Sequence, residues 1–260
     1  MTVYPQLTTG AIAQYPLSKL QTMRTVTNLV PDGSSVKFFD PGAGTTEWQL
    51  SYQALTDAER DTLEKFFQDM EGSLLTFTFL DPAGNLLSHS EDLNDPNWET
   101  DPLLTVSAGG SGPSESQGAL LTNSSGAAQS IRQRLSAPNS YQYCASLYAR
   151  SDLGGSVLTV QLGEKKADFN LSPDWRRLVL SSDGGSEEDA VTFAITVPSG
   201  AIEISGVQLE AQAGASGYKP THGRGGVYPD ARFSHDVLRF TTDDLNHHSC
   251  RVRIIHAEHI

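Results

Sequence analysis

The chain has few cysteines and no long apolar run, and each shortage excludes a class of protein. Cys144 and Cys250 are the two cysteines among 260 residues, which excludes a disulfide framework and predicts free thiols in a reducing cytosol. No stretch approaches the roughly 18 apolar residues of a membrane span. The first six residues lack the basic and apolar regions of a secretory signal. We therefore expect a cytoplasmically made chain without membrane insertion.

Basic residues are also scarce. The sequence holds 18 Lys and Arg against 31 Asp and Glu, a net charge of −13. Binding to nucleic acid relies on clustered Lys and Arg that contact phosphates, and this sequence has no such stripe. The acidic balance also disfavours anionic membrane surfaces. The composition therefore predicts neither a nucleic-acid nor a membrane partner.

Signatures of catalysis are missing as well. The sequence has no phosphate-binding loop, no Gly-x-Gly-x-x-Gly, no Gly-x-Ser-x-Gly and no His-Glu-x-x-His. A glycosidase needs two facing carboxylates, and nothing singles out a pair among the 31 acidic residues. The histidines near Cys250 match no standard zinc spacing. We therefore expect a protein that is not an enzyme.

The clearest local pattern is a strand, a helix and a second strand between residues 46 and 80. Thr46–Gln53 alternates apolar and polar residues, as a half-buried strand does. Thr56 and Glu59 form a capping box, and apolar residues then recur at helical spacing until Gly72. The stretch Leu74–Leu80 predicts the second strand. The sequence therefore predicts one amphipathic helix lying across a sheet.

The composition changes between residues 85 and 221, where 137 residues include 21 Ser and 14 Gly. Short alternating apolar runs separated by Gly, Ser, Pro and Asp turns predict a β-sandwich or jelly roll. Residues 1–44 read as loops with brief strands such as 35–39. Three further strands are expected at 231–233, 237–240 and 251–255, too few for an independent domain. They would complete the sheet of residues 46–80.

The predicted fold class is therefore mainly β. A small β-barrel or sheet scaffold with one amphipathic helix is discontinuous, covering residues 1–84 plus 222–260. It carries an inserted jelly-roll, galactose-binding-like sandwich at residues 85–221. The two ends of the insert must lie close together for this arrangement, which sandwich termini usually permit.

Aromatic residues of the insert are candidates for binding carbohydrate, because the apolar faces of sugars pack on aromatic rings. The candidates are Trp98, Tyr141, Tyr143 and Trp175. The alternative is core packing: the two tyrosines belong to a predicted strand in which alternate residues fill the core, and it is the favoured reading for Trp175. Trp98 follows a predicted loop and is the better surface candidate.

Three carboxylates lie at the two ends of the insert and are candidates for a structural Ca²⁺ site. Glu91 and Asp92 lie near its beginning and Glu210 near its end. Calcium favours clustered oxygen ligands of this kind, so the closure of the insert would bring the three side chains together. The sequence indicates no other cofactor.

Two sets of residues resemble known families. Residues 48–52, 55–59, 63–67 and 72–77 resemble the ring-forming distal tail and minor tail proteins of long-tailed bacteriophages and gene transfer agents. Residues 85–92 and 97–98, with 207–210 and 218–221, resemble the opening and close of carbohydrate-binding-module-like sandwiches. The first resemblance implies a homohexameric ring at the virion tail tip, assembled in the cytoplasm of the bacterial host, that joins tail tube to hub.

The sequence therefore predicts a virion structural protein whose insert binds a glycan of the host surface. Six displayed copies would convert weak binding at each site into useful avidity. Two alternatives stay open: a purely structural role in which the sandwich contacts a neighbouring tail protein, and a host-glycan depolymerase. The second would need a long groove and usually a repeated β-helix, and the sequence contains no internal repeat.

Overall fold

The computed structural model describes residues 1–113, 116–152 and 156–257, and two compact units divide them. The sandwich unit comprises Leu80–Val227 together with Met1 and Thr8–Ile12. The scaffold unit comprises Thr2–Leu7, Ala13–Phe79 and the chain from Tyr228 onward. The described residues are mainly β with one α-helix, which is the fold class that the sequence predicts. No helix among them has both the length and the apolar character of a membrane span.

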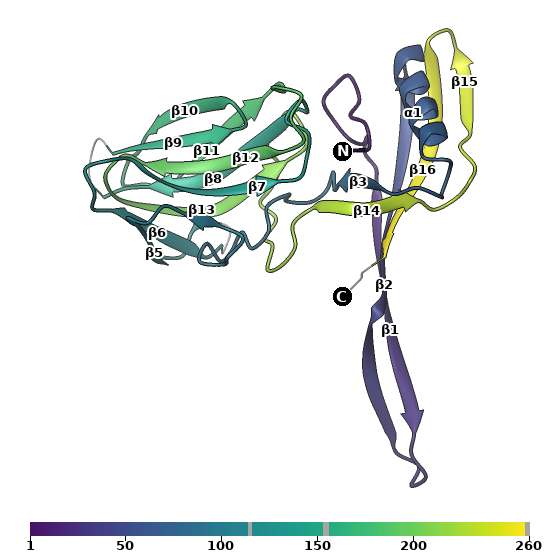
Figure 1. The fold of residues 1–260 in the computed structure, drawn as a ribbon, viewed down its shortest axis with the longest axis horizontal. Coiled ribbons are helices and arrows are strands. Elements are labelled where there is room, and N and C mark those ends of the chain that lie inside the picture. The colour runs from purple at the N-terminus through teal and green to yellow at the C-terminus, as the bar shows by residue number, and fades with distance from the viewer. Residues whose placement is uncertain (114–115, 153–155, 258–260) are drawn as a thin grey trace. The chain divides into compact units, whose positions relative to one another are not determined.

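The scaffold unit is built on one sheet with the strand order β1-β2-β16-β14-β3, and β15 pairs with the edge of β16 (Figure 1). The strands come from both ends of the chain. The C-terminal strands therefore complete the sheet that β2 and β3 begin. The sequence predicts this, because so few strands cannot form a domain of their own. The bounds are β1 Ser18–Leu29, β2 Ser35–Leu55, β3 Phe77–Leu80, β14 Val227–Phe233, β15 Phe240–Asp244 and β16 His247–Ala257.

The helix α1, Asp57–Asp69, begins with the predicted capping box. The backbone N–H of Glu59 donates to Thr56 Oγ1 at 3.2 Å, and Glu59 Oε2 accepts from the backbone N–H of Thr56 at 3.0 Å. On its apolar face, the Phe66 ring lies edge-on to Phe77 and Phe233, at centroid distances of 5.1 and 5.9 Å. The helix is thereby fixed to two strands of the sheet.

Two of the predicted strands have other bounds than expected: β3 is shorter, and β15 begins three residues later in the chain. β3 begins at Phe77, whereas Leu74 and Leu75 are exposed in the turn after the helix. Gly72 has φ +65°, and the N–H of Leu75 donates back to Met70 O at 3.1 Å, so this stretch closes the helix instead of extending the strand. Val237, predicted in a strand at 237–240, precedes β15 in a loop.

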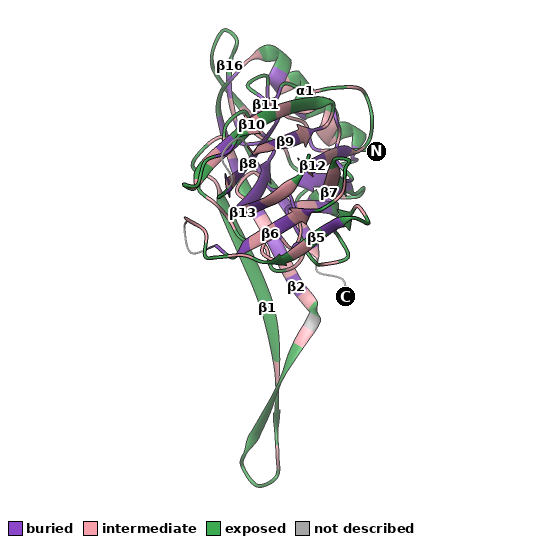
Figure 2. Cartoon of the chain, turned by 90° about the vertical axis from the view of Figure 1, so that its left-hand side faces the viewer, coloured by how far each residue is buried: buried purple, intermediate pink, exposed green. Residues whose placement is uncertain are grey.

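The prediction of loops with brief strands holds for residues 1–17 and is wrong for residues 18–44. β1 and β2 form one long hairpin, paired from Ser18 with Gln49 to Leu29 with Ser35 across a bulge at residues 22–24. Gly33, with φ +86°, makes the turn. Because β16 pairs with β2 only from Thr45 onward, residues 23–44 form a two-stranded extension, which we call the arm. Figure 2 shows that most of the arm is exposed.

The sandwich unit consists of two five-stranded antiparallel sheets with apolar side chains between them. The first sheet has the order β10-β9-β12-β7-β4 and the second has the order β11-β8-β13-β6-β5. The bounds are β4 Glu99–Thr100, β5 Leu104–Ala108, β6 Gly118–Asn123, β7 Gln129–Leu135, β8 Tyr143–Arg150, β9 Val157–Leu162, β10 Lys165–Asn170, β11 Arg176–Ser182, β12 Val191–Val197 and β13 Gly200–Glu210.

The buried side chain of Asn85 joins the beginning of the insert to its end. Its Oδ1 accepts from the N–H groups of Leu87 and Leu209, at 3.1 and 3.0 Å. Its Nδ2 donates to Val207 O at 2.9 Å. Four residues earlier, the N–H of Asp81 donates to Gly226 O at 2.8 Å. The entering and leaving chains therefore run side by side.

Candidate functional site

The outer face of the second sheet carries a row of side chains from four neighbouring strands. Arg150 ends β8, and it pairs with Glu203 on β13, which in turn pairs with Leu120 on β6. Trp175 immediately precedes β11, whose first residue, Arg176, pairs with the neighbour of Arg150. Because residues directly opposite on adjacent strands point to the same face, the row runs Trp175, Arg150, Glu203, Leu120.

The guanidinium of Arg150 lies between an aromatic ring and a carboxylate. Its Nε and Nη2 donate to Glu203 Oε2 at 3.1 and 2.8 Å. On the other side, its Cζ lies 4.8 Å from the centroid of the Trp175 ring. The pair is partly exposed, so it contributes about 1 kcal/mol or less to stability. Its main effect is to hold three side chains of different chemistry in fixed positions.

A pocket of about 230 Å³ opens at this row. We call it the Arg150 pocket, and it is lined by Leu120, Arg150, Ser151, Asp152, Ala201 and Glu203. Arg150 offers N–H donors, Asp152 and Glu203 offer carboxylate acceptors, and Leu120 offers an apolar wall. The volume falls below the roughly 300–1,000 Å³ of pockets for drug-sized molecules. The site is therefore small and combines hydrogen-bond donors, acceptors and an apolar wall.

Further along the same face, residues 211–220 cover the sheet and are fastened by Glu210. This carboxylate is buried, and Lys219 Nζ donates to its Oε1 at 2.7 Å. Its Oε2 accepts from the backbone N–H of Ser216 at 2.9 Å and from Gln208 Nε2 at 2.8 Å. Arg177 also donates to the carbonyl of Ser216. These bonds leave the Arg150 end of the face as the open part.

The three carboxylates of the predicted calcium site do not gather into one cluster. Burial raises the pKa of Glu210, but hydrogen bonds from Lys219 and Ser216 outweigh it and hold the pKa below its ordinary value. The Glu210 carboxylate is therefore already paired with an ammonium group. Glu91 instead accepts from the Tyr218 hydroxyl and from the N–H of Gln117. Among the described residues, no group of three His, Cys, Asp or Glu side chains could hold a metal ion.

Asp92, the third carboxylate of that prediction, has a local role. Its Oδ1 accepts from the N–H of Asn94 at 3.0 Å, and its own N–H donates to His89 O at 3.1 Å. Asp92 thus stabilises the turn that follows the opening of the insert, and side chains of this type commonly bond to the backbone two residues on.

The four aromatic candidates are not brought together. Trp98, the favoured surface candidate, is 4% exposed: its Nε1 donates to His89 O at 3.1 Å and its ring lies 6.2 Å from that of Phe193. Tyr143 is also buried, and its hydroxyl donates to Pro138 O at 2.8 Å. Tyr141 is half-buried in the turn before β8. Trp175, for which core packing was favoured, is the one that reaches the outer face.

Sequence reasoning missed Arg150, Asp152 and Glu203. The strand patterns containing Arg150 and Glu203 were visible, and their alternation places both side chains on the outer face. Their partnership depends on the register between β8 and β13, and the two residues are 53 positions apart in the sequence. The sequence contained a signal for the Glu210 ion pair but none for these three residues. The motif Tyr218-Lys219-Pro220, which closes the insert, contains the lysine that pairs with Glu210.

No protein-family model and no curated protein sequence matches this chain. Solved structures with a similar fold include the enzymatically active domain of bacteriophage CBA120 tailspike protein 4, at a TM-score of 0.40 and 16% identity. That match covers 51% of this chain and 22% of the tailspike chain. The chain thus spans about a fifth of the tailspike, and it spans 29% of a similar xylanase chain from Clostridium thermocellum.

Two carbohydrate-binding modules are similar in fold. The xylan-binding domain CBM22-1 of Paenibacillus barcinonensis Xyn10C has a TM-score of 0.42 and 15% identity, over 52% of this chain and 99% of that one. TmCBM61, solved with β-1,4-galactotriose, has a TM-score of 0.35 and 10% identity, over 48% and 97%. These values describe a general sandwich architecture, and no residue role is transferred from them.

Proposed function

We propose that this chain is a structural subunit of the tail tip of a long-tailed phage or gene transfer agent. In this proposal, six copies form a ring that links the tail tube to the hub after assembly in the bacterial cytoplasm, and each sandwich unit binds a glycan of the host surface. The observation that carries the glycan part is the Arg150 pocket, with Trp175 beside it.

The groups that line the pocket match the groups that a sugar ring presents. A sugar presents vicinal hydroxyl groups around a ring with an apolar face. Both Arg150 contacts end on Oε2 of Glu203, and Oε1 of this carboxylate is an additional acceptor for a sugar hydroxyl. The guanidinium offers further N–H groups to hydroxyl oxygens. Leu120 and the half-buried Trp175 supply apolar surface for the ring face.

The ring part is supported by the scaffold unit. Met23, Leu29 and Phe39 on the arm are 72%, 83% and 61% exposed, and large apolar side chains in water are a feature of surfaces that a partner covers. A tail subunit that is buried by its neighbours would carry such a surface. The acidic composition also suits a particle protein that binds neither nucleic acid nor membrane.

The glycan proposal is tested with the full chain on an array of bacterial surface polysaccharides. We expect Trp175→Ala to weaken binding about tenfold or more, because it removes the ring contact. Glu203→Gln should weaken binding similarly by removing an acceptor. Val179→Ala is the matched control. Val179 is exposed on the same face of the sheet, but it lies opposite Ser146 and does not line the Arg150 pocket. Absence of binding by the wild-type chain, or unchanged binding by both variants, contradicts the proposal.

Two other functions make different predictions. If the sandwich contacts a neighbouring tail protein, electron micrographs of particles should show density continuous with it and the array should stay blank. If the chain is a depolymerase, incubation with host polysaccharide should release reducing ends. The ring proposal itself fails if mass photometry finds only monomers and no ring is seen in micrographs.

A further inference from the structure

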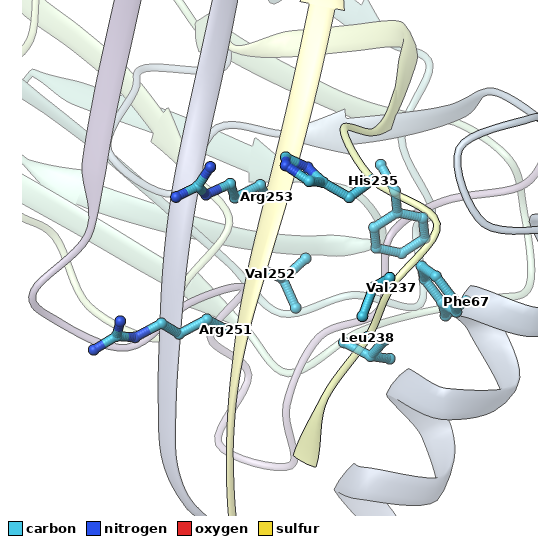
Figure 3. A pocket seen from close by; sticks show the side chains of 8 residues that line it. Phe67, His235, Val237, Leu238, Arg251, Val252 and Arg253 are labelled. Carbon is cyan, nitrogen blue, oxygen red and sulfur yellow. The ribbon is translucent and has the colours of Figure 1, made fainter. Parts of the chain in front are cut away.

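The face of the scaffold sheet that lies away from α1 carries exposed arginines on β16. Figure 3 shows Arg251 and Arg253 projecting from one side of this strand, whereas Val252 between them is directed toward Phe67 of the helix. Side chains alternate between the two faces of a sheet along a strand. The two arginines therefore belong to the outer face, and the core of the scaffold unit lies on the other face.

The strands on either side of β16 place an arginine and a serine next to Arg251. On β2, Ser51 pairs with Arg251. On the other side, β15 begins at Phe240, which pairs with Cys250. When this register is continued by one residue, Arg239 lies opposite Arg251, and residues directly opposite on adjacent strands point to the same face. Two guanidinium groups are therefore neighbours on the outer face of the sheet.

A recess of about 540 Å³ opens at these two arginines, and we call it the Arg251 recess. Its lining includes the hydroxyl groups of Ser51, Thr241 and Ser249, which come from three neighbouring strands. Hydroxyl and guanidinium groups donate hydrogen bonds, and none of the described residues that line the recess is Asp or Glu. The volume lies within the roughly 300–1,000 Å³ of small-molecule sites. The recess is therefore rich in donors and large enough for a small molecule.

The two guanidinium groups lack the carboxylates that accompany other arginines. In the part of the chain that the structure describes, neither Arg239 nor Arg251 forms an ion pair, although the sequence has 31 acidic residues against 18 Lys and Arg. Elsewhere arginines pair with carboxylates, as Arg24, Arg60, Arg132 and Arg150 do. Like charges directly opposite each other on adjacent strands are destabilising, and such local conflicts are expected at functional sites. The arrangement therefore points to an anion that both guanidinium groups bind.

We propose that the Arg251 recess binds a phosphate group, with the guanidinium groups of Arg239 and Arg251 on its oxygens. Each guanidinium can present two parallel N–H groups to an oxyanion. A carboxylate has two oxygens and is filled by one such fork, whereas a phosphate group has oxygens for both forks and for a hydroxyl group. The net charge of −13 repels an anion at long range, but charges farther away than about 8 Å are screened at physiological ionic strength. This inference is independent of the proposed ring and of the Arg150 pocket.

Calorimetric titration of the full chain with inorganic phosphate, at an ionic strength fixed with sodium chloride, tests the site. Arg239→Gln and Arg251→Gln should each weaken binding about tenfold or more, as loss of one hydrogen bond to a charged group does. Both side chains are exposed, so the variants should fold. Arg232→Gln is the matched control, because Arg232 is exposed on the same face but lies opposite Ile255. Ile255 is four residues from Arg251 along β16, roughly 13 Å, so the control should change binding less than about threefold.

Stability without phosphate gives a readout that a merely structural arginine would not give. Because like charges opposite each other are destabilising, Arg239→Gln should unfold at a higher temperature than the wild type in phosphate-free buffer. Phosphate at about ten times its Kd should reverse this order, since a ligand stabilises the folded state by RT ln(1 + [L]/Kd). Hydrogen exchange of peptides from β15 and β16 should slow in the wild type when phosphate is added.

Two further ligands identify the source and the shape of the anion. Tighter binding of glucose 1-phosphate than of inorganic phosphate would assign the recess to an organic phosphate whose remainder contacts the apolar lining residues Pro16 and Val237. Equal binding of the two would assign it to free phosphate. Acetate, with two oxygens, should bind about tenfold more weakly or worse.

Three results would overturn the inference. The first is a wild-type chain that phosphate stabilises no more than sodium chloride of the same ionic strength does. The second is a loss of binding in Arg232→Gln as large as that in the two recess variants, which would show general charge attraction. The third is acetate that binds as tightly as phosphate. Trp175→Ala should leave phosphate binding unchanged, so a failed phosphate site is distinguishable from a failed glycan site.

Discussion

Replacing Lys219 by Met should destabilise the sandwich unit at neutral pH. Lys219 Nζ lies 2.7 Å from Glu210 Oε1, and the Glu210 side chain is 2% exposed while that of Lys219 is 31% exposed. The substitution keeps the length of the side chain and removes its charge. It leaves Glu210 as a buried carboxylate whose remaining partners are neutral groups, the side chains of Ser216, Gln208 and Gln212 among them.

The magnitude follows from the geometry. Two unit charges 2.7 Å apart attract by roughly 6 kcal/mol at an effective dielectric constant near 20. Part of this is offset because the partly exposed ammonium no longer has to lose water. Removing one member of a buried pair costs about 3–5 kcal/mol. Because Lys219 retains some solvent contact, we expect about 3 kcal/mol.

The direction of the Glu210 pKa shift decides how the Lys219→Met penalty changes with pH. Burial raises the pKa of Glu210, and the hydrogen bonds from Lys219 and Ser216 bring it below its ordinary value. A carboxyl with a lowered folded pKa contributes stability above its unfolded pKa, and this contribution is lost as the pH falls through the folded value. The difference between wild type and variant should thus be largest near pH 7. It should shrink below about pH 4, where protonated Glu210 no longer needs a cation.

Urea unfolding followed by tryptophan fluorescence measures the change, and hydrogen exchange of peptides from β8 and β13 reports the sandwich unit separately. Lys166→Met is the matched control, because Lys166 is exposed on β10 and should shift stability by less than about 0.5 kcal/mol. A Lys219→Met penalty below about 1 kcal/mol at pH 7, or one that does not diminish in acid, would refute the role given to the Glu210 pair.

Three further outcomes are expected. Trp98→Ala should destabilise the sandwich by about 3–5 kcal/mol in thermal or urea unfolding, because it empties a buried site. Gly225→Ala should destabilise the return to the scaffold, since the added Cβ would lie 2.1 Å from the carbonyl oxygen of Leu86; proteolysis at this return should be faster than in wild type. Thr56→Ala should cost about 1 kcal/mol by removing the helix cap, with faster hydrogen exchange at the first turn of α1.

The sequence predicts best where the signal is local. The capping box of Thr56 and Glu59, the apolar spacing around Phe66 and the turn residues of the insert all act within a few residues, so their structures follow from their patterns. The arm was missed because its sequence lacks such a local pattern. Its strands contain Pro41 and a bulge near Met23, and neither face is apolar enough to give the alternation that burial against a core imposes.

The site could be predicted only in part, because it depends on register. Trp98 was placed at the surface because it follows a loop, yet that loop folds back so that its indole N–H meets the carbonyl of His89. Trp175 was expected in the core because strands bury alternate residues, but it lies just before β11, where the row of Arg150 and Glu203 supplies its neighbours. The burial of Trp98 and the position of Trp175 on the outer face both depend on residues far away in the sequence, so the neighbouring residues do not predict them.

The size of the pocket has a consequence for the proposed glycan binding. A recess of about 230 Å³ with one aromatic neighbour has room for little more than one sugar unit, and an affinity near 1 mM corresponds to only about −4 kcal/mol. In the proposed ring, linked sites would raise overall binding by about 10²–10⁴-fold without any new contact. Under the proposed function, the full ring should therefore bind a polysaccharide far more tightly than a single chain binds one sugar, and Trp175→Ala should weaken both.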